Sequence, residues 1–322
     1  MPRAVAFTHP REAPTAITLA EPPVGPGQVR VRLEACGLGV ADFGFFQLDA
    51  LPRQPLIPGL EAVGRVDAVG DGVTLPVGRR VGLSPLASTC GTCAACSRGR
   101  ERWCEQAVLH GWHRDGFLAE AVVVAARAVV PLEPGDDAAA LAPLFATGWT
   151  ALSAVRTAGL VAGQRLGVIG LGGLGHLVVQ HARADGLEVS AVDVDPARQQ
   201  LGVTLGATKG LTGRLDAVVV ATPSTQAIQL AARTVARGGT VVLAAASPSV
   251  RFDLSLFDAV MRGVALRPAF LGSSHELDEG LARARSGAVV PRVSRIALSE
   301  VPARFWLLRD GGFDGRLVAT MP

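Results

Sequence analysis

Residues 165–175 read RLGVIGLGGLG, and this stretch decides the fold of the second half of the chain. The apolar run 166–169 has the length of one buried parallel strand. Helical periodicity follows at 176–184. The turn between them has the pattern G-x-G-x-x-G with one further glycine, over Gly170, Gly172, Gly173, Leu174 and Gly175. Such a turn bends at its first glycine, admits a pyrophosphate at its second, and lets helix and strand pack closely at its third.

An acidic residue follows the next apolar run, 188–192, in the place that a dinucleotide site requires. Asp193 lies 23 residues after Gly170, close to the ~20 at which a carboxylate meets the ribose hydroxyls. The helix N-terminus would offer free N–H groups to the pyrophosphate. The pattern therefore predicts a dinucleotide site that prefers NAD(H) to NADP(H), because Asp193 would repel a 2′-phosphate. The alternative is an ordinary βαβ unit with a glycine-rich turn.

Helical and strand patterns continue to alternate after Asp193. We expect helices at 196–205 and 225–237, and strands at 217–221 and 240–245. This alternation predicts a doubly wound parallel sheet. Residues 1–130 differ, since short strands between Gly/Pro turns are typical of a partly open β-barrel. The chain of 322 residues is therefore expected to form two domains.

Four of the five cysteines fall within 15 residues, at Cys90, Cys93, Cys96 and Cys104. The spacing C-x2-C-x2-C-x7-C can surround one tetrahedral Zn²⁺ and leave no open coordination position. Disulfides or free thiols are the alternative. The N-terminus lacks the apolar core of an export signal, so we expect a cytoplasmic protein, where disulfides are rare. The prediction is one structural zinc.

Composition excludes several partners and chemistries. A net charge of +3 is too small to indicate nucleic acid or a membrane surface, and no apolar run reaches the ~18 residues of a membrane helix. The chain has no Tyr, and Lys209 is its only lysine, so a Tyr–Lys proton-transfer pair is impossible. We expect a small-molecule substrate.

Several motifs together resemble the zinc-containing medium-chain dehydrogenase/reductase family, of the alcohol dehydrogenase type. They are CGTCAACSRGRERWC (90–104), GLGGLG (170–175), PGLEAVGRV (58–66), VGRRVG (77–82), RDGFLAEAVVV (114–124) and GRLV (315–318). The resemblance implies an α/β fold: a GroES-like, mostly-β catalytic domain and a doubly wound Rossmann domain. The catalytic domain would comprise 1–147 and 271–322, with its zinc lobe at 88–105, and the Rossmann domain 148–270. It also implies a homodimer or homotetramer, with Thr150 beside the nicotinamide and Arg316 at the pyrophosphate.

The chain departs from this family at the positions that hold a catalytic zinc. The three ligand positions are occupied by Gly39 in CGLGVAD, Leu60 in GLE and Ala146 in LFATGWT. The proton-relay positions hold Val40 and Ala41. Small or apolar side chains cannot bind Zn²⁺, so we expect hydride transfer without a catalytic metal, to a polarised C=C or C=N bond.

Two carboxylates, Asp42 and Glu61, fall where the family has acidic residues near its metal. Desolvation could raise the pKa of either and make it a general acid or base. Three alternatives remain at this point. Asp42, Glu61, Cys36 and a histidine could rebuild a metal site; the scaffold could serve a non-redox cyclase or isomerase; or the chain could bind a nucleotide without catalysis.

Overall fold

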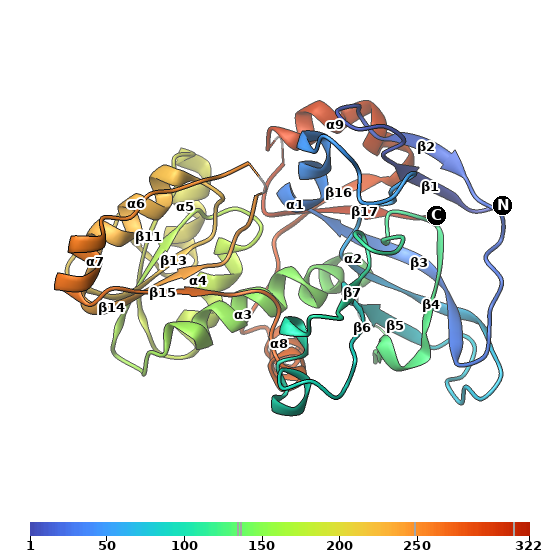
Figure 1. Ribbon diagram of the computed structural model, residues 1–322, viewed down its shortest axis with the longest axis horizontal. Helices are drawn as coiled ribbons and strands as arrows, with labels where there is room; N and C mark the ends of the chain where they lie inside the picture. Colours follow the sequence, from blue (N-terminus) through green and yellow to red (C-terminus); the bar gives the residue numbers. More distant parts are fainter. Residues whose placement is uncertain (134, 136, 248, 312) are drawn as a thin grey trace. The chain divides into compact units, whose positions relative to one another are not determined.

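The computed structural model describes residues 1–133, 135, 137–247, 249–311 and 313–322. They form two compact units (Figure 1). Unit 1 comprises Met1–Ala146 and Val293–Pro322, and unit 2 comprises Thr147–Arg292. The second boundary therefore differs from the expected one at residue 271, because the segment 271–292 belongs to unit 2. Its helix buries Leu277 and Leu281, and its Arg283 donates a hydrogen bond to the carbonyl of His181 in the same unit.

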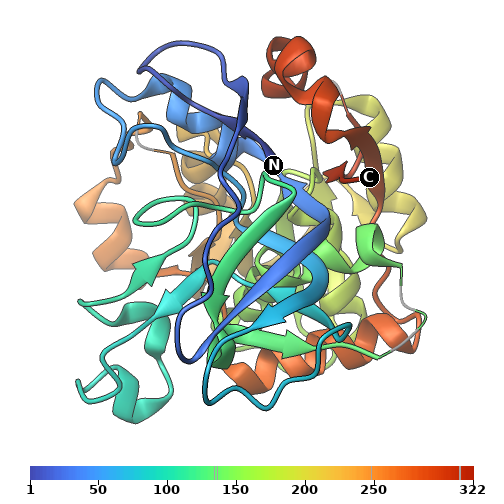
Figure 2. The ribbon, with the colours of Figure 1, turned by 90° about the vertical axis from the view of Figure 1, so that its right-hand side faces the viewer.

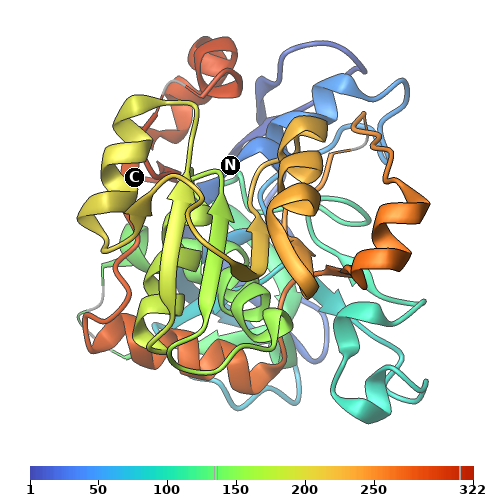
Figure 3. The same ribbon diagram turned by 90° about the vertical axis from the view of Figure 1, so that its left-hand side faces the viewer.

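A parallel sheet forms the centre of unit 2, with strands in the order β12-β11-β10-β13-β14-β15 among the described residues. Figure 3 shows this sheet with α5 (yellow) and α6 (orange) beside it. The strands are β10 (Arg165–Ile169), β11 (Glu188–Val192), β12 (Thr208–Lys209), β13 (Leu215–Val220), β14 (Val235–Leu243) and β15 (Ala265–Pro268). The helices are α3 (Thr147–Ala158), α4 (Gly175–Ala184), α5 (Pro196–Thr204), α6 (Thr225–Thr234), α7 (Leu256–Arg262) and α8 (Ser274–Arg285).

Both faces of this sheet are buried, as the continuous apolar runs predict. On β13, Ala217 and Val219 join the hydrophobic cluster that includes residues of α3 and α4. Val218 and Val220, which point the other way, join the cluster that includes α6. Because neighbouring side chains of a strand point to opposite faces, one apolar run supplies two cores. The strand order starts from β10 and winds outward on both sides, so the predicted doubly wound Rossmann sheet is confirmed.

Among the described residues, unit 1 is built around a β-sheet with strand order β16-β17-β3-β4-β5-β9 and with β8 also paired to β3. Figure 2 shows β3 (blue) and β4 (cyan) at its centre. Its strands are β3 (Gln28–Leu38), β4 (Glu61–Val69), β5 (Arg80–Leu83), β8 (Ala121–Ala125), β9 (Val129–Pro131), β16 (Val293–Ala297) and β17 (Arg316–Thr320). All pairs are antiparallel except β16 with β17. The GroES-like, mostly-β domain is thereby confirmed.

Smaller elements complete unit 1. Two short ribbons pair β1 (Arg3–Ala6) with β2 (Thr15–Thr18) and β6 (Leu86–Ser88) with β7 (Val108–Leu109). The helices are α1 (Val40–Phe43), α2 (Ala138–Leu141) and α9 (Val301–Arg309). The 3-10 turns are η1 (Gly44–Gln47), η2 (Cys96–Arg98), η3 (Glu101–Trp103), η4 (Ala126–Ala128), η5 (Ala142–Phe145) and η6 (Leu298–Glu300).

In the described part of the chain, no single helix is long and apolar enough to cross a membrane. The consecutive helical segments Ala138–Phe145 and Thr147–Ala158 pass that test as a pair, by length and composition alone. Most side chains of α3 are buried within the protein.

Candidate functional site

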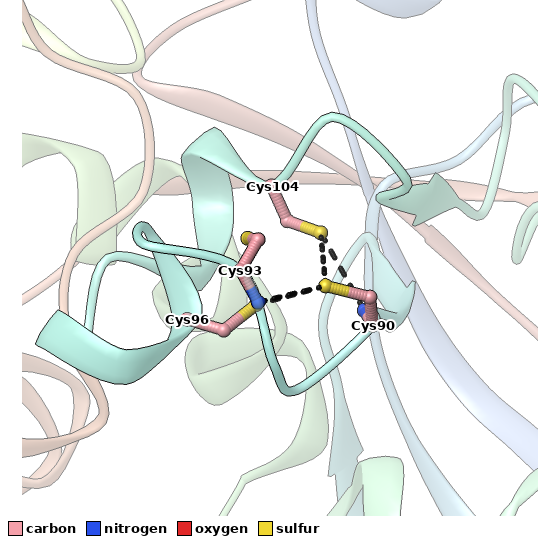
Figure 4. Close-up of side chains that lie close together, drawn as sticks. All are labelled: Cys90, Cys93, Cys96 and Cys104. Carbon is pink, nitrogen blue, oxygen red and sulfur yellow. Dashed lines mark hydrogen bonds between the residues drawn. The ribbon is translucent and has the colours of Figure 1, made fainter.

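The four clustered cysteines converge on one point of the lobe between β6 and β7 (Figure 4). Their sulfur atoms all lie within 4.8 Å of one another. The Cys90 sulfur is 3.6 Å from that of Cys104 and 3.9 Å from that of Cys96. Zn–S bonds of about 2.3 Å in a tetrahedron place the sulfur atoms ~3.8 Å apart, so the arrangement fits one zinc ion.

The lobe shifts the pKa values of two of its thiols in opposite directions. Backbone N–H groups of Thr92 and Cys93 donate to the Cys90 sulfur and lower its pKa to about 6. Burial has the opposite effect on Cys96 and raises its pKa to about 11, so a bound cation would be what deprotonates it. Four protein ligands close the coordination sphere. A zinc ion here would cross-link the lobe and offer no position to a substrate.

The glycine-rich turn has the backbone geometry that its sequence predicts. Gly170 has φ of +90°, which residues with a side chain rarely adopt. A Cβ on Gly175, the first residue of α4, would overlap the carbonyl oxygen of Gly170, so helix and strand are in close contact. A Cβ on Gly172 would meet only the Arg198 Nη1 atom, at 3.8 Å. Gly173 and Leu174 lead from this open point into α4.

Asp193 lies directly beyond the end of β11 and is half-buried. One carboxylate oxygen accepts the N–H of Leu171, at 2.6 Å, and the other accepts that of Asp195, at 2.9 Å. The acidic side chain is thereby tied to the residue between the first two glycines. Arg198 lies near the same point, with its Nε 3.8 Å from the carboxylate of Asp195.

Asp42 and Glu61 lie at the end of the sheet of unit 1 and have different partners. The Asp42 oxygens accept hydrogen bonds from the N–H groups of Gly39, at 2.9 Å, and Gly59, at 3.0 Å. Glu61 begins β4 and accepts a hydrogen bond from Arg316 Nε, at 2.7 Å. Both carboxyl groups are buried. Asp42 therefore links two turns of the backbone, whereas Glu61 forms a charge pair.

Burial changes the protonation of this cluster. It raises the pKa of Asp42 to about 6, although the Arg316 charge and the two backbone N–H groups act in the opposite direction. It also raises the pKa of the Cys36 thiol well above its usual value, with the neighbouring carboxylates adding to the effect. Cys36 consequently stays a neutral thiol at physiological pH.

Local sequence reasoning did not predict that Arg316 pairs with Glu61. The two residues are 255 positions apart, and the strand order brings them together because β17 and β4 both pair with β3. A Cβ at Gly39 would overlap the Arg316 Nη1 atom, and a Cβ at Gly37 would overlap Glu61. Both glycines leave room for the ion pair.

Thr150, a predicted site residue, and the buried His110 both bond to neighbouring backbone. The Thr150 hydroxyl accepts the N–H of Leu271, at 3.1 Å, within unit 2. His110 is buried against Phe117 and bonds through Nδ1 to the carbonyl of Asp115. Among the described residues, the four cysteines are the only group of three or more His, Cys, Asp or Glu that could hold a metal ion. Asp42, Glu61 and Cys36 therefore do not form the rebuilt metal site considered above.

Known proteins match over almost the whole chain. The sequence model of the alcohol dehydrogenase GroES-like domain matches residues 25–134, and that of the zinc-binding dehydrogenases matches 173–286. An alcohol dehydrogenase of Geobacillus stearothermophilus is 35% identical over 315 residues, which are 92% of this chain and 93% of that protein. The chain belongs to the zinc-containing medium-chain dehydrogenase/reductase family, of the alcohol dehydrogenase type.

Solved structures agree with this family assignment. The alcohol dehydrogenase of Aeropyrum pernix superposes with a TM-score of 0.91 at 25% identity, over 99% of both chains. An acetophenone reductase of Geotrichum candidum, in complex with NAD, superposes with a TM-score of 0.90 at 26% identity, over 98% of this chain and 96% of that one. This dehydrogenase is an NAD(P)-dependent oxidoreductase.

Proposed function

We propose that this dehydrogenase transfers hydride from a reduced nicotinamide to a polarised C=C or C=N bond, without a catalytic zinc. The observation that carries the proposal is the identity of three residues. Gly39, Leu60 and Ala146 stand at the family's three ligand positions, and none has a metal-binding atom. The volume beside Gly39 is occupied by the guanidinium of Arg316. A bound nicotinamide supplies or accepts the hydride, and the side chains around it determine which substrate can react.

The possible substrates differ in the negative charge that develops on their oxygen atom during hydride transfer. Oxidation of an alcohol passes through an alkoxide, which a catalytic zinc stabilises by several kcal/mol. Leu60, Ala146 and Val40 would instead surround that oxygen with apolar groups, and an unpaired charge there is strongly unfavourable. Hydride delivery to a conjugated carbonyl or an iminium ion distributes or neutralises the charge. Such acceptors therefore suit this set of side chains better than alcohols do.

The cofactor site is proposed at the glycine-rich turn and Asp193. The open backbone at Gly172 and the α4 N-terminus would face the pyrophosphate, and Asp193 would accept the ribose hydroxyls. The carboxylate disfavours a 2′-phosphate, so NAD(H) should bind more tightly than NADP(H). Thr150 beside the nicotinamide and Arg316 at the pyrophosphate remain predictions from the family resemblance.

Asp42 is proposed as the proton donor. Its pKa of about 6 keeps a fraction of the carboxyl protonated near neutral pH. Glu61 is paired with Arg316, so its proposed role is to orient that guanidinium. The chemistry needs one proton for each hydride, and Asp42, a buried carboxyl group that accepts the N–H of Gly39, would supply it.

A homodimer or homotetramer is proposed for the assembled enzyme. On α7, Leu256, Phe257 and Val260 are all more than two-thirds exposed, and the neighbouring β15 ends the parallel sheet among the described residues. An exposed apolar helix beside an unpaired sheet edge favours association with a second copy. Size-exclusion chromatography with light scattering, on wild type and Phe257→Glu, would test this assembly.

An assay of the purified protein against alcohols, aldehydes, enones and cyclic imines tests the function. We expect NADH oxidation with enones or imines and none with simple ketones. Oxidation of alcohols at an ordinary turnover of about 10 per second, unchanged by added zinc, would refute the proposal. Product formation without NADH consumption would indicate a cyclase or isomerase. Nucleotide binding without turnover of any compound would indicate a non-catalytic protein.

A further inference from the structure

The ion pair between Arg316 and Glu61 lies in a space that two glycines keep open. Gly37 and Gly39 flank it at the end of β3, and a Cβ on either would overlap one partner. Gly39 has φ of −158°, an extended conformation that any residue can adopt, so its backbone does not require glycine. Space for the guanidinium is therefore the physical reason for glycine at position 39.

The guanidinium is nearly buried but keeps donors available. The Arg316 side chain is 12% exposed and that of Glu61 is fully buried. Within the described part of the chain, the side chain of Arg316 donates hydrogen bonds to Glu61 alone, through Nε. The N–H groups of Nη1 and Nη2 remain, beside the space at Gly39. A desolvated guanidinium with free donors binds an oxygen that carries negative charge strongly.

We propose that Arg316 is the catalytic residue that binds the carbonyl oxygen of a conjugated substrate. This inference rests on the proposed function and names the group that replaces the metal charge. A carbon–hydrogen bond forms at the β-carbon as the hydride leaves the nicotinamide, which is oxidised. The π electrons move to the carbonyl oxygen, where an Arg316 N–H stabilises the charge. A proton from Asp42 then adds at the α-carbon.

A pyrophosphate contact, the role that the family resemblance gives Arg316, predicts a different result. Loss of such a contact weakens cofactor binding and leaves kcat at saturating cofactor nearly unchanged. Loss of an oxyanion donor lowers kcat by about 10²–10³-fold and leaves the dissociation constant of NADH within about threefold. The two roles are therefore separable in one set of variants.

Two variants and one control variant test the proposal. The double variant Arg316→Gln/Glu61→Gln removes the charges while keeping two hydrogen-bonding side chains, so that no buried carboxylate is left unpaired. Gly39→Ala keeps Arg316 and displaces its guanidinium with one methyl group. Gly44→Ala is the matched control, because Gly44 has φ of −61° and a Cβ there would meet no atom of the described residues within 4 Å. Circular dichroism and melting temperature establish that each variant is folded.

The measurements are steady-state kinetics with an enone, NADH titration by fluorescence, and calorimetric titration of crotonate in the presence of NAD⁺. Crotonate is a conjugated carboxylate that cannot be reduced by the oxidised cofactor. We expect Gly39→Ala and the double variant to lose at least tenfold in kcat and tenfold in crotonate affinity, with Gly44→Ala unchanged.

The outcomes separate this inference from the function on which it rests. An enzyme without enone turnover that still binds crotonate through Arg316 would refute the reaction and support the oxygen-binding site. Full kcat and crotonate affinity in folded Gly39→Ala and in the double variant would overturn the inference. Weaker NADH binding with unchanged kcat would assign Arg316 to the pyrophosphate.

Discussion

Replacement of Asp42 by asparagine should change how the free energy of unfolding depends on pH. Burial raises the pKa of Asp42 from 3.8 to about 6 in the folded chain. Below about pH 4 the carboxyl is protonated in both the folded and the unfolded chain, and it imposes no ionisation cost. Between pH 4 and 6 the unfolded chain loses this proton more readily, so the free energy of unfolding falls as pH rises. Two pH units correspond to about 3 kcal/mol.

The amide that the substitution introduces does not ionise, so the difference between wild type and Asp42→Asn isolates this one group. The stability of unit 1 is measured by urea unfolding at intervals of 0.5 pH units from pH 4 to 8. Amide hydrogen exchange of residues in β3 and β17 reports the unfolding of this unit. We expect the wild type to lose up to about 3 kcal/mol relative to the variant between pH 4 and 7, with no further change above pH 7. A difference that stays constant over this range would refute the reasoning, because it would mean that Asp42 ionises equally in the folded and the unfolded chain.

Three further results are expected. Metal analysis should find one zinc per chain, and Cys93→Ser should lose this zinc and lower the melting temperature by several degrees, because the lobe loses its cross-link; two zincs per chain would contradict the assignment. Gly175→Ala should lower the free energy of unfolding of unit 2 by about 1–3 kcal/mol. Gly172→Ala should fold normally and weaken NADH binding. Equal melting temperatures of these two variants would argue against the close helix–strand contact. NADH should bind more tightly than NADPH in titrations, and Asp193→Asn should reduce that preference, whereas tighter binding of NADPH by the wild type would overturn it.

Local sequence patterns predicted most of the fold. The alternation of apolar runs and helical segments after residue 165 predicted the parallel sheet, because its central strands, such as β10 and β13, are buried on both faces. The glycine spacing predicted the turn after β10, since a positive φ at Gly170 is a local requirement. The boundary near residue 271 was harder to predict, because α8 has a largely polar surface and joins unit 2 through a few buried side chains, such as Leu277 and Leu281, and through polar contacts such as that of Arg283 with Asp185.

The candidate site likewise contains features that the sequence predicts and features that only the fold shows. Sequence spacing alone brings the four cysteines together, because they lie on one short lobe. The pairing of Arg316 with Glu61 depends on the order of strands around β3, and spacing along the chain carries no information about it. The absence of ligand atoms at Gly39, Leu60 and Ala146 is visible in the sequence, whereas the guanidinium beside Gly39 is visible only in the fold.

The position of β17 has a consequence for synthesis of the protein. This strand contains residues 316–320, it follows every other strand of unit 1 in the sequence, and it lies between β16 and β3, inside the sheet. Unit 2 is continuous in sequence and can fold while the ribosome is still translating the last segment, since domains generally fold as units. Unit 1 must wait with β3 incompletely paired until β17 has been translated. Nascent chains stalled before residue 316 should therefore contain a folded unit 2 and an aggregation-prone β-sheet, and Arg316 enters the ion pair only after β17 has left the ribosome.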